Sequence, residues 1–500
     1  MKLAIPWLAS RGLFSSSFAP RNNAKSLLSP SERQLLFVML AWMTFGLSSS
    51  VNAADWIGSE SCASGTCHGG IAGRGPAWNS SYSLSRTRDP HSTSGALLYD
   101  DDSRRIVMAL SPDATTELAY DVVLRQRCIS CHLTATPDDV ASTMPLEPEQ
   151  VGDGVSCESC HGPAGAWKES HVLESWTGPM RFEPATGMLD TESIVGRADG
   201  CVRCHVGSRT ADGMVRDMNH DLIAAGHPAL RFDLLTFNDN MPNHWSASGA
   251  AEQKFSESSI RVRVVGRLIG SAAAATLSSE RATASLAPAA ATHVIAPWPE
   301  LSDFDCFACH QSLSSRAYRL PKTVDGKPSL QVSDGLPLWN AWFTSLDTGK
   351  LDKEKLETGK EVDSVWKFRP KPGGQAQWVL EYQKLADSYR KRAIAEASAE
   401  IPSATATITL IRNNLNKRAP RDWHSAAAMY LELDAAARDM ATDPKTKTFG
   451  TIIYKSLTEK VAPLLLFDVS QADTNARSRS PKDFDPRDFR DKTIKILEDI

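Results

Sequence analysis

Residues 154–163 read Gly-Val-Ser-Cys-Glu-Ser-Cys-His-Gly-Pro, so two cysteines lie three positions apart and a histidine directly follows the second. Thiols about one helical turn apart, here Cys157 and Cys160, can reach the two vinyl groups of one porphyrin and form thioethers. The adjacent His161 then lies over the same porphyrin, with a ring nitrogen on the iron. This spacing therefore predicts covalent attachment of a haem c group.

The same pattern recurs along the chain until every cysteine is used. The chain has 10 cysteines, and all of them fall into pairs that are followed by histidine. A disulfide framework gives no reason for a histidine after each pair, and zinc sites usually combine two such pairs or add a separate one. We therefore predict five haem c groups, attached through the cysteines and ligated by the five histidines on the proximal side. The other four motifs, in chain order, are Cys62/Cys67/His68, Cys128/Cys131/His132, Cys201/Cys204/His205 and Cys306/Cys309/His310.

The first motif differs from the others because four residues separate its cysteines. Its spacer, which includes Gly65, must loop outward to keep both sulfurs near the vinyl groups. The alternative is a disulfide between Cys62 and Cys67. The register of His68 and the repetition of the pattern favour haem.

Seven further histidines are candidates for the second axial position on iron. Two of them, His293 after an alanine-rich stretch and His424 at a helix start, are not expected to bind iron, and His424 is expected at the surface. No methionine stands in a pattern distinct from ordinary apolar packing, so bis-histidine ligation is expected. The five predicted distal ligands are His91, His171, His220, His227 and His244.

Two of these distal candidates, His220 and His227, lie seven residues apart. On a continuous helix they would share a face. Gly226 and Pro228 flank His227, however, and predict that the helix ends there. We therefore expect the two histidines to ligate different haems.

Length and charge limit the possible classes of protein. A chain of 500 residues exceeds one simple core, so two domains or one domain with a large extension are expected. The 55 basic and 59 acidic residues are nearly balanced, which gives no support for nucleic-acid binding.

The N-terminal residues resemble a targeting segment. Residues 35–47 are apolar, Arg33 precedes them, and serines and the small-residue site 51–53 follow. This arrangement predicts a signal peptide over residues 1–53 that exports the chain to the periplasm. The alternative is an uncleaved N-terminal membrane anchor.

The rest of the chain divides by composition into three regions. Residues 54–320 form the expected pentahaem domain, and residues 321–373, with several glycines and prolines, the expected linker and loops. Residues 374–500 contain no cysteine and have helical apolar spacing, so they are expected to form a helical C-terminal extension. We favour a helical cover over the haems for this extension, the alternative being a module that docks a partner.

Apolar spacing also predicts particular helices and contacts. Residues 255–286 are expected to form a helix. In the C-terminal extension a helix face is expected from apolar residues at i, i+4, i+7 and i+11, namely Trp378, Tyr382, Leu385 and Tyr389. Trp298 and Phe304 precede the fifth motif and are expected to pack on its porphyrin.

Beyond the individual motifs, the chain resembles a known group. Its marks are the first motif followed by Gly69-Gly70, Arg88-Asp-Pro-His91, residues 154–163 and residues 218–228. Over about residues 55–311 these resemble a multihaem cytochrome c family related to the tetrahaem cytochrome that accepts electrons from hydroxylamine oxidoreductase in nitrifying bacteria. The wider first motif, the fifth haem motif and the long extension depart from that relative.

The resemblance implies a mainly α fold with stacked haems and little regular sheet. It also implies that His91 ligates the haem of the third motif and that His171 ligates the haem of the first. One haem of the relative has an open iron site, so the resemblance leaves room for an open iron here.

Two functions follow from these observations. The first is a secreted pentahaem electron carrier between redox partner proteins, one of which could be a membrane-bound complex. The second is a multihaem oxidoreductase that acts on a small nitrogen or sulfur compound at one open haem. Five distal candidates for five haems, and the absence of a recognisable catalytic constellation in the sequence, favour the carrier. A structural subunit that docks a membrane complex is a third possibility.

Overall fold

The computed structural model describes a set of segments that all belong to one compact unit, Ala54–Ile500. The predicted signal peptide, most of the predicted linker, Cys309, His310 and His293 lie outside these segments. No helix in the described part of the chain is long and apolar enough to cross a membrane. The described segments are 55–210, 213–242, 244, 258–286, 298–304, 306, 323–324, 327–328, 339, 341–343, 374–400, 403–417, 419–420, 423–465 and 484–498.

Short helices carry the second, third and fourth motifs, and Cys62 of the first motif ends another, because glycine, proline and capping residues interrupt the chain every few residues. Asp100, Thr116 and Ser193, for example, each accept a backbone N–H at the start of a helix. The helices of this region are η1 (Ser59–Cys62), η2 (Ala77–Ser80), α2 (Ser81–Arg88), η3 (Pro90–Thr93), η4 (Ala96–Tyr99), α3 (Asp101–Leu110), α4 (Glu117–Arg127), α5 (Ile129–His132), α6 (Pro137–Ala141), α7 (Pro148–Asp153), α8 (Cys157–His161), η5 (Pro179–Phe182), α9 (Ile194–His205), α10 (His220–Ala224) and α11 (Leu234–Asn240).

Regular sheet is scarce among the described residues, as predicted from the sequence. Strand β1 (Ser208–Arg209) pairs with β2 (Val215–Arg216) in antiparallel register. Strand β3 (Thr323–Val324) pairs with β4 (Lys327–Pro328) in the same way. The prediction of a mainly α fold is confirmed.

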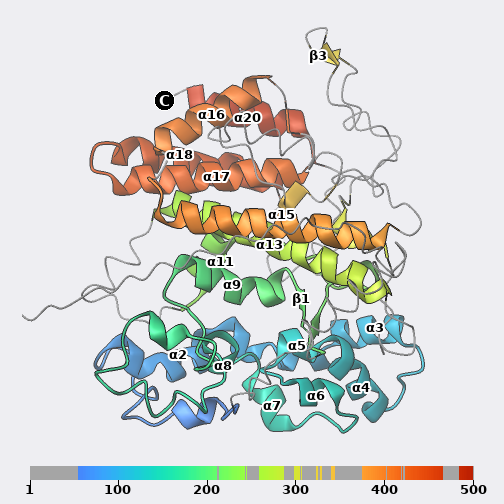
Figure 1. Cartoon of the computed structure of the whole chain (residues 1–500). Helices are drawn as coiled ribbons and strands as arrows, with labels where there is room; N and C mark the ends of the chain where they lie inside the picture. The colour runs from blue at the N-terminus through green and yellow to red at the C-terminus, as the bar shows by residue number, and fades with distance from the viewer. Residues whose placement is uncertain are drawn as a thin grey trace, which may run out of the picture. The chain divides into compact units, whose positions relative to one another are not determined.

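One long helix, α13 (Ser259–Leu286), runs through the main hydrophobic core. It lies side by side with α15 (Gln375–Ser398) and also contacts α9, α11 and α17 (Trp423–Thr442) (Figure 1). The Asp439 side chain caps the N-terminus of α13, because its carboxylate accepts the backbone N–H of Ser259 at 2.6 Å and of Ile260 at 3.1 Å. The predicted helix over 255–286 is thus confirmed where the chain is described.

The C-terminal extension is helical, as predicted. Trp378 and Tyr382 are buried against α13, and Leu385 and Tyr389 pack around them. The helices after α15 are α16 (Ala404–Lys417), α17 (Trp423–Thr442), α18 (Lys447–Lys460), α19 (Ala462–Leu465) and α20 (Pro486–Glu498). They enclose a second apolar cluster that includes Leu415, Leu433 and Leu457.

One side chain differs from its expected environment. His424 is only 1% exposed, so its predicted surface position is wrong; it packs against Trp342 and Trp423. Trp298 packs edge-on against Trp378 at 5.7 Å, and Phe304 is buried in the same cluster. Both aromatics therefore lie in the α13–α15 core, and their packing on the fifth porphyrin stays a prediction.

Parts of the segment predicted as linker also pack inward. Trp339 is buried and forms an isolated β-bridge with Phe304. The short helix η10 (Ala341–Phe343) follows, and its Trp342 donates an indole N–H to the Phe232 carbonyl at 3.0 Å. A few separate aromatic residues attach this stretch to the core. They do not recur at helical spacing, so the sequence did not predict their burial.

Two glycines of α13 give a matched test of this packing. A methyl group at Gly266 would meet Cβ of Leu234 at too short a distance, whereas at Gly270 it would lie 3.5 Å from Phe232, an ordinary contact. We expect Gly266→Ala to lower the free energy of unfolding by about 1–3 kcal/mol. Gly270→Ala should raise it by up to about 1 kcal/mol through helix propensity. Chemical denaturation followed by circular dichroism measures both, and equal stability of the two variants would contradict the close approach of α13 and α11.

Candidate haem sites

Four pairs of histidines come together in the structure, each from distant parts of the chain. The imidazole centroids of His68 and His171 lie 6.2 Å apart and the rings are nearly parallel, at 17°. The other three pairs have their rings at 72° to 86° and are His91–His205 at 6.0 Å, His132–His227 at 6.3 Å and His161–His244 at 6.3 Å.

This spacing fits one metal between each pair. A metal–imidazole bond is about 2 Å long and the ring centre lies roughly 1 Å beyond the bonding nitrogen, so two trans imidazoles on one metal have centroids about 6 Å apart. Within the described residues, no three His, Cys, Asp or Glu side chains gather as a bare metal site would need. The pairs therefore suit an iron whose other four ligands come from a porphyrin.

Hydrogen bonds orient six of these eight rings. In each, Nδ1–H donates to a carbonyl or carboxylate oxygen, which leaves Nε2 for the metal. The acceptors are the carbonyl oxygens of Trp78 for His68 at 2.8 Å, Ser94 for His132 at 3.1 Å, Lys168 for His171, Pro228 for His227 at 2.9 Å and Pro242 for His244 at 3.2 Å, and the Asp89 carboxylate for His91 at 2.9 Å.

Burial keeps several of these rings neutral. It lowers the pKa of both His161 and His205 to about 4. His91 is the opposite case, since the hydrogen bond from its ring to Asp89 raises its pKa. A neutral imidazole is the form that ligates iron, so the buried rings need not lose a proton at neutral pH.

The pairs agree with one of the two pairings that the resemblance implies and differ from the other. His171 faces His68, as implied. His91 faces His205, however, although the resemblance implied that His91 serves the third motif. The ring facing His161 is instead that of His244, which lies far along the chain.

His220 starts α10, and its backbone N–H donates to Oε1 of Glu300 at 2.8 Å. Helix α10 ends at Ala224, and Gly226 has φ of 117°, in the left-handed region that favours glycine. The predicted end of the helix before His227 is therefore confirmed, and only His227 reaches His132. The fifth motif contributes Cys306 to the described residues.

None of the nine described cysteines forms a disulfide with another described cysteine. Cys62 and Cys67 are among them, so the structure does not support the alternative disulfide. Burial raises the pKa of Cys128 to about 12 and that of Cys201 to about 11. Zinc or iron–sulfur sites need thiolates, whereas an uncharged thioether suits such apolar surroundings.

A buried carboxylate within the third motif organises the first haem site. Glu158 is 2% exposed. Its oxygens accept the backbone N–H groups of Ile57 at 3.1 Å, Gly58 at 2.9 Å and Ala164 at 2.7 Å. Those segments lead into the first motif and toward His171, so one side chain holds both sides of the His68–His171 pair. Sequence reasoning treated Glu158 only as a spacer.

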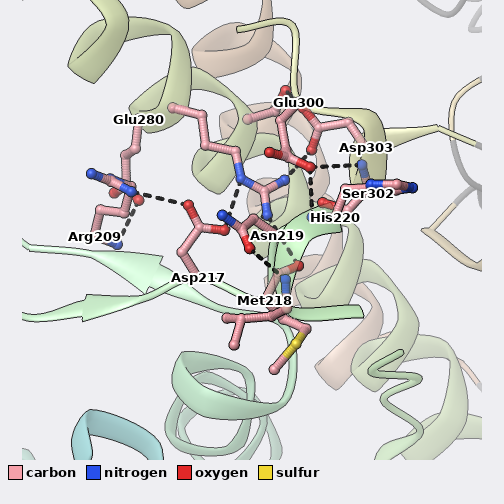
Figure 2. A network of polar contacts seen from close by, with 12 residues as sticks. Arg209, Asp217, Met218, Asn219, His220, Glu280, Glu300, Ser302 and Asp303 are labelled. Carbon is pink, nitrogen blue, oxygen red and sulfur yellow. Dashed lines mark hydrogen bonds and ion pairs between the residues drawn. The ribbon is translucent and has the colours of Figure 1, made fainter. Parts of the chain in front are cut away.

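A second polar network includes the backbone of His220 and reaches Asp303, which stands three residues before Cys306 (Figure 2). Arg281 of α13 contacts Asp217 and Asp303, and Arg209 contacts Asp217 at 3.0 Å. Sequence reasoning missed these residues as well. The one signal was a charged pair, Glu280-Arg281, inside the second half of the helix, which otherwise consists mostly of small residues.

A mainly helical fold that pairs histidines beside Cys-Cys-His motifs is the architecture expected of a c-type cytochrome. Residues 83–162, which include the second and third motifs and His91, match the family model of cytochrome c554 and c-prime. The match supports a cytochrome c family, with haem c as the cofactor, electron transfer as the role and redox proteins as partners. No curated protein and no solved structure matches the chain significantly.

The position of Glu158 predicts a large effect of its removal. Glu158→Ala should lower the free energy of unfolding by about 2 kcal/mol or more, because buried N–H donors lose a charged acceptor. Glu169→Ala removes an exposed carboxylate nearby and should change stability by less than about 0.5 kcal/mol. Denaturant unfolding of the haem-loaded protein measures both. Equal stability of the two variants would show that the Glu158 contacts contribute nothing.

Proposed function

We propose that the chain is an exported, periplasmic pentahaem c-type cytochrome that transfers electrons between redox partner proteins. The observation that carries this proposal is the set of four histidine pairs at the spacing of trans ligands on one iron. Each pair joins a motif histidine to a distal candidate. Irons with both axial positions occupied by protein exchange electrons and leave no position for a substrate.

The fifth haem is assigned by elimination. The four pairs use the distal candidates His91, His171, His227 and His244. His220 remains for the fifth motif, and it lies in one polar network with Asp303, three residues before Cys306. We propose His220 and His310 as the axial ligands of this haem.

Neighbouring thiols support an order for the haems. The pKa of Cys157 is raised to about 11, mainly by burial and secondly by the nearby Cys62 thiol. The pKa of Cys160 is raised to about 12, mainly by burial and secondly by the nearby thiols of Cys201 and Cys204. The proximity of these thiols favours an electron-transfer path from the haem of the first motif through that of the third to that of the fourth.

The path continues from the fourth motif to the second. A hydrogen bond with Cys204 raises the pKa of Cys131 well above its usual value, so these two thiols are in contact. The fifth haem would then lie beside the second, because α10 and the turn after it carry both His220 and His227. A row of neighbouring haems suits electron transfer through the chain.

The chain's own residues would tune and shield the haems. The bound haem supplies one-electron chemistry, and the protein controls it through axial ligands, burial and hydrogen bonds. The Asp89 carboxylate accepts a hydrogen bond from Nδ1–H of His91, which would make that imidazole a stronger ligand and would favour the oxidised iron. Phe237 packs edge-on against His205 at 4.5 Å and helps exclude water from that ring.

The haem count is the first test of this proposal. After cleavage near Ala53, the denatured protein should show a mass increase of five haems, because thioethers survive unfolding. Intact-protein mass spectrometry measures this. Four additions with a Cys62–Cys67 disulfide would refute the first site, and a mature chain that retains residues 35–47 would refute cleavage of the signal peptide.

The ligand assignment predicts the response to carbon monoxide. The reduced wild-type protein should bind none, and its haems should be low-spin. His227→Ala should open the iron of the second motif and create one carbon monoxide site, with the covalent haem count unchanged. The control His293→Ala alters a histidine outside the proposed ligand set and should bind none.

Magnetic circular dichroism and carbon monoxide titration distinguish these outcomes. A methionine–iron signature would contradict bis-histidine ligation. Stoichiometric carbon monoxide binding by the wild-type protein would favour the oxidoreductase with one open haem.

A further inference from the structure

Arg281, near the C-terminal end of α13, is a buried cation that contacts two separate segments of the chain. Its Nη2 lies 2.5 Å and its Nε 3.0 Å from Oδ1 of Asp217. Its Nη1 donates to Oδ1 of Asp303. The side chains of all three residues are at most 8% exposed.

Those two segments lead directly to the proposed fifth haem. Asp217 stands three residues before His220, and Asp303 three residues before Cys306. Arg281 therefore connects the chain that carries the distal ligand to the chain that carries the first thioether.

Three further contacts make the connection rigid. Ser278, one turn earlier on α13, donates its hydroxyl to Oδ2 of Asp303 at 2.7 Å. Asn219 caps α10 through the backbone N–H of Leu222 at 3.1 Å. Oε1 of Glu300 accepts N–H groups of both His220, at 2.8 Å, and Ser302, at 2.9 Å, so it links the two segments directly.

The charges explain why arginine is required at position 281. Burial opposes ionisation of Asp217, but Arg281 and Arg209 lower its pKa below the usual value, so its carboxylate remains charged. A planar guanidinium can bind two carboxylates in two directions at once. A lysine ammonium keeps the charge but has no such fork, so it cannot hold both aspartates in the same positions.

We infer that Arg281 is a positioning residue for the fifth haem, which holds the His220 segment and the Cys306 segment at the separation that one porphyrin requires. This inference rests on the proposed fifth haem. It gives the C-terminal part of α13 a role in ligand geometry, beyond its packing against α15.

The test uses the full haem-loaded chain with two substitutions, Arg281→Lys and Arg281→Met. Both should convert one haem of five from low-spin to high-spin and create one equivalent of carbon monoxide binding, because both remove the fork. Loss of the fifth covalent haem in either variant, seen by mass spectrometry, would equally support the inference. If Arg281 acted through its charge alone, Arg281→Lys would keep all haems low-spin, and that result overturns the inference.

A matched control acts on the other end of the same helix. Asp439→Ala removes the cap at the start of α13 and should lower stability without changing any haem signal. The same spectral change in this control would mean that any loosening of α13 opens an iron, which also overturns the specific role of Arg281.

A milder variant tests the inference if the two Arg281 variants do not fold. If neither arginine variant yields folded protein, Asp303→Asn, which weakens only the contact on the Cys306 side, should produce the same high-spin haem, and its absence refutes the inference. The wild-type haem count separates this result from the proposed function. Four haems in the wild-type protein would refute the fifth haem itself, whereas five haems with unchanged Arg281 variants would refute only the positioning role.

Discussion

The distance of about 6 Å between paired imidazole rings is the constraint on which the arrangement of the N-terminal half depends. A few tenths of an ångström decide whether two nitrogens can share one metal, so the short helices must be fixed to one another by specific contacts. Ser94 illustrates this. Its hydroxyl oxygen lies 2.6 and 2.7 Å from the carbonyl oxygens of His91 and His132, which share its one hydrogen, and its own carbonyl accepts the ring N–H of His132.

Two buried charged side chains perform comparable tasks at different motifs. Glu158 gathers backbone N–H groups from both sides of the His68–His171 pair, and Arg281 gathers carboxylates from the segments that lead to His220 and Cys306. A buried charge lowers the free energy of unfolding unless it is fully paired, and removing one partner leaves the other charge buried and unpaired. Such residues therefore fix one geometry more firmly than apolar packing would.

The sequence was sufficient for features with a strict local pattern. Cys-Cys-His spacing identified the motifs, helical periodicity identified α13 and α15, and Gly226 marked the end of α10 before His227. The pairing of His91 with His205 could not be read, because no local pattern records which distant ring faces which. The burial of His424 was missed for the same reason, since its neighbours Trp342 and Arg231 come from distant segments.

The four histidine pairs also determine how the chain must assemble. Their members lie roughly 80 to 115 residues apart, and the pairs interleave: the first members, at 68, 91, 132 and 161, all precede any second member, and the second members follow in the same order, at 171, 205, 227 and 244. No pair can close before residue 171 has been synthesised, by which point all four are open. Contacts of such long sequence separation slow folding. Maturation of this half would consequently be a collective event. A porphyrin attached at the first, second or third motif would await a second ligand from later in the chain, whereas His91 precedes the cysteines of the fourth motif.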